Sequence, residues 1–150
     1  MSSGSAPAFS PPDGQHCRVL AIDPGRDKCG LAVVDFFCGG ATVRKRCIVG
    51  PLEVPATATH LSQLYEITQL LLGDSTTSQR LAENLRQALP QMELHMVNEK
   101  GSTLAARTLY WAAHPPRGWR RMLPLSLQEP PEPVDDFAAV VLARRFFGVE

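Results

Sequence analysis

The sequence predicts a single α/β domain whose core is a five-stranded mixed sheet flanked by helices. A length of 150 residues and a hydrophobic content of 44% suit one globular domain with a sizeable core. Apolar runs of strand length come first in a group of three and then alternate with helical patterns, in the order βββ, α, β, α, β, α. Short turns between the first three strands indicate an antiparallel meander, and helical crossovers indicate that the last two strands are parallel.

The first three strands are predicted from apolar runs and the glycine-containing turns between them. The first run ends at Asp23, because Pro24 cannot continue a central ladder. On the third strand, Arg44 and Arg46 are two positions apart and are therefore expected on one face of the sheet. The three strands are expected at residues 19–22, 30–34 and 41–49.

The later elements follow from helically spaced apolar residues and from two further apolar runs. They are expected as helices over 57–67, 81–89, 102–111 and 134–147, and as strands over 70–73 and 92–97. Residues 114–124 contain three prolines and are expected to form a long loop without helix. A loop of this length in a compact domain usually has a function.

Composition narrows the classes of protein to which the chain can belong. Residues 1–16 are rich in Ser and Pro and are predicted to be a flexible tail before a single domain over 17–150. We find neither a secretory signal pattern nor an apolar run of membrane-spanning length. Four cysteines lack C-x-x-C spacing and are expected to be reduced thiols of a cytoplasmic protein: Cys17, Cys29, Cys38 and Cys47. With 15 basic and 15 acidic residues, nucleic-acid binding would depend on local basic patches.

Carboxylates stand at two predicted strand ends and at the start of the last helix. Asp23 ends the first strand, Glu99 follows the last one, and Asp135 and Asp136 open the helix. Asp23 alone could equally cap its turn, and Asp135 and Asp136 taken alone would be interpreted as an N-terminal cap or dipole partner of the helix. Because sites in α/β sheets lie at the carboxyl ends of parallel strands, the acids are expected to converge. Carboxylates that share a pocket repel one another, and divalent cations with oxygen ligands relieve that repulsion.

Two other segments carry candidate nucleic-acid contacts. Thr76 and Thr77 precede the 81–89 helix, where they either cap the helix or line a phosphate seat at its positive end. In the 114–124 loop, Trp119 either stacks on an unpaired base or folds the loop onto the domain. The cations of this loop, suited to gripping a phosphate backbone, are Arg117, Arg120 and Arg121.

Three motifs together resemble one known family. IDPGRDKCGLAVVD at 22–35 resembles a D-x-G strand turn, and NEKGSTLAAR at 98–107 is similar to a D-E-R-x-S-T-x-x-A-R signature. VDDFAAVVLARRFF at 134–147 is similar to a V-D-x-x-A-A helix. In this order and spacing, residues 18–147 resemble the ribonuclease H-like nucleases of the YqgF (RuvX) group, relatives of the RuvC Holliday-junction resolvases.

The resemblance implies a ribonuclease H-like fold, a bacterial origin and a nuclease. It implies that Asp23, Glu99 and Asp135 are the catalytic metal ligands, with Asp136 as the second candidate for the last position. It further implies two Mg²⁺ or Mn²⁺ ions, which would act together on a phosphodiester. Structured RNA precursors or branched DNA are the implied substrates.

The chain departs from the family pattern at two positions next to Glu99. Asn98 replaces the usual Asp and loses a charge, and Lys100 replaces the usual Arg and loses the guanidinium fork. Because the three acids are retained, we expect cleavage to survive while substrate handling differs. Phosphate contacts around the acids are expected from Arg26, Lys28, Lys100 and Arg107.

These observations predict a metal-dependent nuclease that hydrolyses phosphodiester bonds, either in pre-16S ribosomal RNA processing or on branched or single-stranded DNA. Homodimer formation stays open. A rival hypothesis is a non-catalytic nucleic-acid-binding or scaffold module of the same fold, favoured by the zero net charge and by Asn98. An ATP-dependent phosphotransferase is a third, because sugar kinases also begin with a D-x-G hairpin, but 150 residues leave no room for their second lobe.

Overall fold

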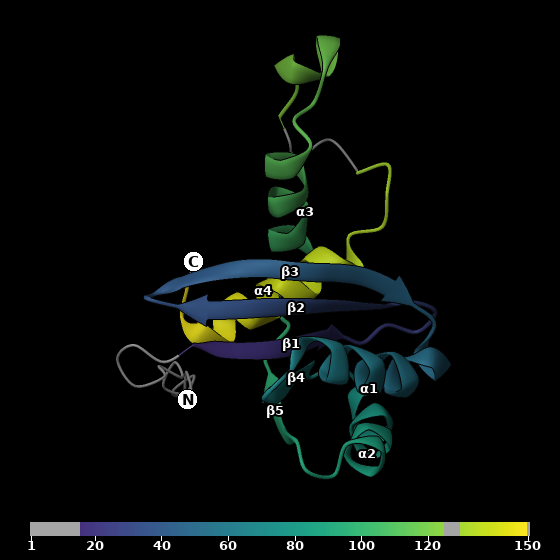
Figure 1. Cartoon of the computed structure of the whole chain (residues 1–150). Helices are drawn as coiled ribbons and strands as arrows, with labels where there is room; N and C mark the ends of the chain where they lie inside the picture. The colour runs from purple at the N-terminus through teal and green to yellow at the C-terminus, as the bar shows by residue number, and fades with distance from the viewer. Residues whose placement is uncertain (1–15, 125–129, 150) are drawn as a thin grey trace, which may run out of the picture.

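The computed structural model describes residues 16–124 and 130–149, with the exception of the Arg120 side chain. A five-stranded sheet forms the centre, in the order β3-β2-β1-β4-β5 (Figure 1). Its strands are β1 (Cys17–Asp23), β2 (Cys29–Phe37), β3 (Gly40–Val49), β4 (Gln69–Gly73) and β5 (Glu93–Val97). The helices are α1 (Val54–Tyr65), α2 (Ser78–Ala88), α3 (Ser102–Ala113) and α4 (Asp135–Phe147), with short 3-10 turns η1 (Pro51–Glu53) and η2 (Gly118–Met122).

Strand pairing confirms the predicted fold class. The β1–β2 and β2–β3 pairs are antiparallel, whereas β1–β4 and β4–β5 are parallel. The carboxyl ends of β1, β4 and β5 therefore meet at one edge of the sheet, as ladders between parallel strands require. This edge is where the candidate acids gather.

Both faces of the sheet are covered, which explains why its central strands read as continuous apolar runs. One core contains Leu20, Ile22 and Leu31 and is covered by α1 and α2. The other contains Val19 and Ala21 and is covered by α4. α3 rises away from the sheet and packs on α4 through a separate small cluster (Figure 1).

The structure corrects three local predictions. α1 begins at Val54 rather than at residue 57, because Pro55 is well suited to the first turn of a helix. The 114–124 segment is not wholly free of helix, since η2 forms one short 3-10 turn after its first prolines. A register shift in the β2–β3 ladder turns Arg44 towards Asp35 and leaves Arg46 beside Asp136 of α4, so the two arginines lie on opposite faces.

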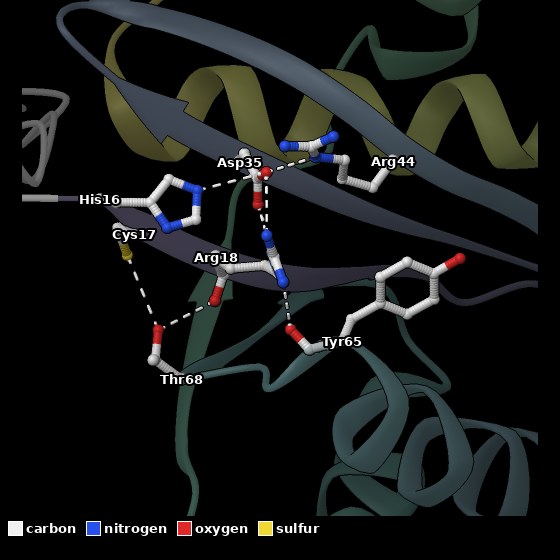
Figure 2. Close-up of polar contacts among 7 residues, drawn as sticks. All are labelled: His16, Cys17, Arg18, Asp35, Arg44, Tyr65 and Thr68. Atoms are coloured by element: carbon white, nitrogen blue, oxygen red, sulfur yellow. Dashed lines mark hydrogen bonds and ion pairs between the residues drawn. The ribbon is translucent and has the colours of Figure 1, made fainter.

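The end of the sheet opposite the acids is held by a buried carboxylate. Asp35 is 4% exposed, and its two oxygens accept hydrogen bonds from Arg18 and Arg44, each with a nitrogen–oxygen distance of 2.5 Å (Figure 2). His16 Nε2 lies 3.2 Å from the same carboxylate, and Arg18 also donates to the Tyr65 carbonyl at 2.6 Å. This network joins β1, β2 and β3 to the end of α1.

Residues 1–15 of the predicted tail lie outside the described residues, and His16 directly precedes β1. All four cysteines are free, with Cys17 and Cys29 buried and Cys38 exposed. None of the described helices is both long enough and apolar enough to cross a membrane.

Candidate functional site

Asp23 and Asp135 are brought together by close packing of α4 on the sheet. Asp23 is the last residue of β1, and its partner across the antiparallel ladder is Gly30. A Cβ atom at Gly30 would lie 1.9 Å from the backbone oxygen of Asp135, so α4 begins directly on the bare backbone of β2. The absence of a side chain at this position therefore sets the first helical residue beside the end of β1.

Glu99 reaches the same edge from the segment after β5. A Cβ atom at Gly73 would lie 2.7 Å from Glu99 Oε2 and 3.1 Å from Pro24, so the carboxyl group crosses the end of β4 towards the end of β1. Asp23 and Glu99 share a side-chain hydrogen bond. Both side chains are partly buried.

A fourth acid belongs to this cluster and was not among the residues proposed from the sequence. Asp74 directly follows β4, and its Oδ1 accepts a hydrogen bond of 3.1 Å from the Glu99 backbone nitrogen. The Asp74 backbone nitrogen in turn donates to the Val97 carbonyl at 3.0 Å. An acid directly after an apolar run was the signal used for Asp23, and the same signal identifies Asp74.

The electrostatics show that negative charge is crowded at this edge. Burial raises the pKa of Asp23 to about 7, with further contributions from the charges of Glu99 and Asp135 and from the hydrogen bond to Glu99. Burial also raises the pKa of Glu99, followed by the charge of Asp74. Groups that resist ionisation in this way are frequent at functional sites.

The donor chemistry of the cluster fits a hard divalent cation, which prefers carboxylate oxygens and offsets their repulsion. The positions of these side chains fit a bound ion only in part. In residues 16–124 and 130–149, no three His, Cys, Asp or Glu side chains stand close enough to hold one ion. Asp23 and Glu99 are in contact, while Asp135 acts on Asp23 through its charge.

Asp136 occupies a different environment from Asp135. Its Oδ2 accepts a hydrogen bond of 3.1 Å from Arg46 Nη1, and its Oδ1 accepts one of 3.0 Å from the Phe137 backbone nitrogen. The Arg46 guanidinium also lies 4.0 Å from the centre of the Phe137 ring. Asp136 therefore fastens the start of α4 to β3.

The loop after β5 is ordered by its own polar groups. Asn98 Oδ1 accepts a hydrogen bond of 2.9 Å from the Lys100 backbone nitrogen, so this side chain shapes the turn. Arg145 of α4 donates to the Asn98 carbonyl at 2.9 Å. The Lys100 side chain is exposed.

The remaining candidate contacts divide into two groups. Arg26 and Lys28 are exposed in the β1–β2 loop directly after Asp23. Thr76 and Thr77 are exposed before α2, where Thr77 makes no side-chain capping bond to the described helix and instead lies 3.0 Å from the Ser75 hydroxyl. The capping alternative is therefore wrong for Thr77.

The second group lies along and beyond α3. Arg107 is half-buried on α3, and Arg117, Trp119 and Arg121 are exposed in or next to η2 at the far end of this helix (Figure 1). The side chain of Arg120 is outside the described residues. The η2 groups therefore follow the far end of α3, which packs beside the start of α4.

Comparison of the sequence with known proteins finds short matches. The chain is 42% identical over 52 positions to the crossover junction endodeoxyribonuclease RuvC of Frankia casuarinae. This match covers 34% of this chain and 28% of that protein. RuvC of Cutibacterium acnes is 36% identical over 58 positions, covering 39% and 29%. The chain thus matches less than a third of the length of these relatives. No family model matches the sequence.

Comparison of the structure covers nearly the whole chain. RuvC of Thermus thermophilus, solved with a Holliday junction substrate, has a TM-score of 0.58 at 14% identity and covers 88% of this chain and 94% of its own. Fowlpox virus resolvase, solved with Holliday junction DNA, has a TM-score of 0.62 at 6% identity and covers 87% and 97%. The fold is ribonuclease H-like, and the short sequence matches are to RuvC proteins. A specific relation to the YqgF group does not follow from them.

Proposed function

We propose that this protein is a divalent-metal-dependent nuclease that hydrolyses phosphodiester bonds in branched DNA. The observation that carries the proposal is the convergence of Asp23, Glu99 and Asp135 at one edge of the sheet, where the pKa of Asp23 is raised to about 7 by burial and by its acidic neighbours. A cluster that resists ionisation without a counter-charge is suited to a site for cations.

The three acids would hold the metal, and the elements around them would position the acids. Asp74 orients the backbone of Glu99, and Arg46 holds the start of α4 through Asp136, which places Asp135. When bound, a pair of Mg²⁺ or Mn²⁺ ions supplies polarisation of the phosphodiester and activation of the attacking water. Arg26 and Lys28 are exposed beside Asp23 and would contact the flanking phosphates.

Branched DNA is preferred as the substrate because both the sequence matches and the fold lead to junction-cleaving enzymes. Processing of pre-16S ribosomal RNA and cleavage of single-stranded DNA are the other substrates suggested by the sequence motifs. The decisive experiment compares a four-way junction, a structured ribosomal RNA precursor and single-stranded DNA, each with Mg²⁺ and with Mn²⁺.

Single substitutions of the acids test the assignment. Asp23→Asn, Glu99→Gln and Asp135→Asn should each lower the cleavage rate roughly 1000-fold or more, since losing a metal removes several kcal/mol of transition-state stabilisation. Asp136→Asn should have a much smaller effect, because its carboxylate is bonded to Arg46. An inactive Asp136→Asn protein beside an active Asp135→Asn protein would show that the ligand assignment is wrong by one residue.

One observation favours the non-catalytic alternative, namely that no three acidic or other ligating side chains in the described residues stand close enough to hold one ion. Titration of the protein with Mn²⁺ by calorimetry distinguishes the two hypotheses. If the protein is a nuclease, it should bind Mn²⁺, and the Asp23→Asn variant should not. A scaffold module would bind DNA without binding the metal and without cleaving any of the three substrates.

A further inference from the structure

The zero net charge of the chain conceals a strong separation of charge along the sequence. Between Lys100 and Pro124 there are five basic residues and no acidic residue. The rest of the chain has ten basic and fifteen acidic residues. The cations are therefore concentrated in one continuous segment that starts directly after Glu99.

This segment extends away from the central sheet. α3 begins three residues after Glu99, rises away from the sheet and carries η2 at its far end (Figure 1). Twelve helical residues span about 18 Å at 1.5 Å per residue. The far end of the helix lies beside the start of α4, since the ring centres of His114 and Phe137 are 6.4 Å apart, and η2 follows this end.

The far end of α3 is held in place by aromatic packing. The His114 ring stacks on Tyr110 with 4.6 Å between ring centres, and Tyr110 meets Phe137 of α4 edge-on at 5.8 Å. Tyr110 is buried, and Phe137 belongs to the same cluster between α3 and α4. Because α4 also begins with Asp135, the position of η2 is linked to that of the candidate site.

The tip of the segment presents its charges to solvent. Arg117 and Arg121 are exposed, and Trp119 is 71% exposed. Together with His114 and Pro116, the two arginines line an open hollow of about 640 Å³. Exposed guanidinium groups beside an exposed indole suit a sugar-phosphate backbone, because phosphates take the charges while the ring stacks on a base.

We propose that α3 and η2 form a basic arm that binds the phosphate backbone of the DNA flanking the cleavage site. This role rests on the proposed function for the identity of the substrate, and it adds a second contact region on the same DNA.

The test is DNA binding without divalent metal, so that no cleavage occurs, measured by fluorescence anisotropy on a labelled four-way junction between 50 and 200 mM salt. In the Arg117→Ala/Arg121→Ala protein the salt dependence should flatten by about 0.9 log unit per log salt for each phosphate that is no longer neutralised. The ratio of its Kd to that of the parent protein should therefore shrink roughly tenfold across this range of salt. The matched control is Arg80→Ala/Arg86→Ala, which removes two exposed charges from α2.

The outcomes separate the arm from the catalytic proposal. The arm is supported if the η2 variant flattens the salt dependence of junction binding and the α2 control does not. It is overturned if the slope is unchanged, or if the α2 control changes it equally, since the effect would then be one of net charge. If the protein cleaves none of the substrates but the η2 variant still flattens the salt dependence of junction binding, the proposed nuclease activity is refuted and the DNA-binding arm is not.

Discussion

Asp35 is the residue whose ionisation should matter most for stability away from the acid cluster. Burial alone would raise its pKa, but hydrogen bonds from Arg18, Arg44 and His16 outweigh burial and lower the pKa to about 2 (Figure 2). An unfolded Asp titrates near 3.9. Because the folded pKa is the lower one, the stabilisation is complete above about pH 4 and is lost as the pH falls towards 2.

This shift predicts a pH-dependent effect of Asp35→Asn. At pH 7 the variant should lose about 2 kcal/mol of unfolding free energy, because the amide cannot be a charged acceptor for two arginines. The difference between the two proteins should narrow as the pH falls from 4 to 2, because the unfolded carboxylate is protonated first and half of the folded carboxylate is protonated near pH 2. Urea unfolding at pH 7, 4 and 2.5 measures it. A difference that stays constant with pH would mean that packing, and not charge, stabilises this end of the sheet.

Individual site residues differ in how far the sequence could identify them. Asp23 and Glu99 are candidates because an acid after an apolar run is a local signal, and Asp74 carries the same signal but was not among the candidates. The contact of Arg46 with Asp136 joins residues that are 90 positions apart, through a register shift in the β2–β3 ladder. No local pattern foretells such a contact, and it explains why two adjacent aspartates have different partners.

At the scale of elements, the packing of α4 on β2 leads to a sharp prediction for Gly30→Ala. A Cβ atom at this position would lie 1.9 Å from the Asp135 oxygen and 2.5 Å from the Asp136 nitrogen, so the start of α4 must move. Overpacking of this kind costs roughly 1–3 kcal/mol or more. We expect that loss in thermal or urea unfolding, together with a lower cleavage rate, because Asp135 moves with the helix.

Gly40→Ala is the matched control in the same sheet. A Cβ atom at Gly40 would have as its nearest described neighbour the Phe37 oxygen, at 3.7 Å, which is ordinary contact. Its effect on unfolding should stay within about 0.5 kcal/mol. Equal losses in Gly30→Ala and Gly40→Ala would show that the helix contact does not set the cost at Gly30, since replacing Gly by Ala by itself stabilises through the entropy of the unfolded chain.

The order and type of the main elements were predictable because buried strands and amphipathic helices leave periodic patterns. The exceptions are features determined by single residues or by the tertiary fold. The left-handed backbone at Glu66, with φ of 53°, ends α1 at Tyr65, two residues earlier than the leucine pattern suggested. η2 forms among prolines and a glycine, where local propensity argues against helix.

For the whole molecule, net charge is a poor guide to nucleic-acid binding, because it averages over parts of the chain with different charge. The α3–η2 segment is positive, while the rest of the chain has an excess of acids that includes the cluster at the edge of the sheet. Electrostatic attraction to DNA depends on the potential near the contact surface, since salt screens charges beyond about 10 Å. A neutral protein can therefore bind DNA through one arm.

The N-terminal segment provides the last test at this scale. Removing residues 1–15 while keeping His16 should change the melting temperature by less than about 2 °C, which for a chain of this size corresponds to about half a kcal/mol. The segment contains no apolar period that could dock on the domain, and His16 keeps its contact of 3.2 Å with Asp35. The deletion also removes one acid and no base, so the salt dependence of junction binding should stay unchanged. Differential scanning calorimetry and the anisotropy series measure the two effects, and a drop of several degrees would show that the segment is part of the folded domain.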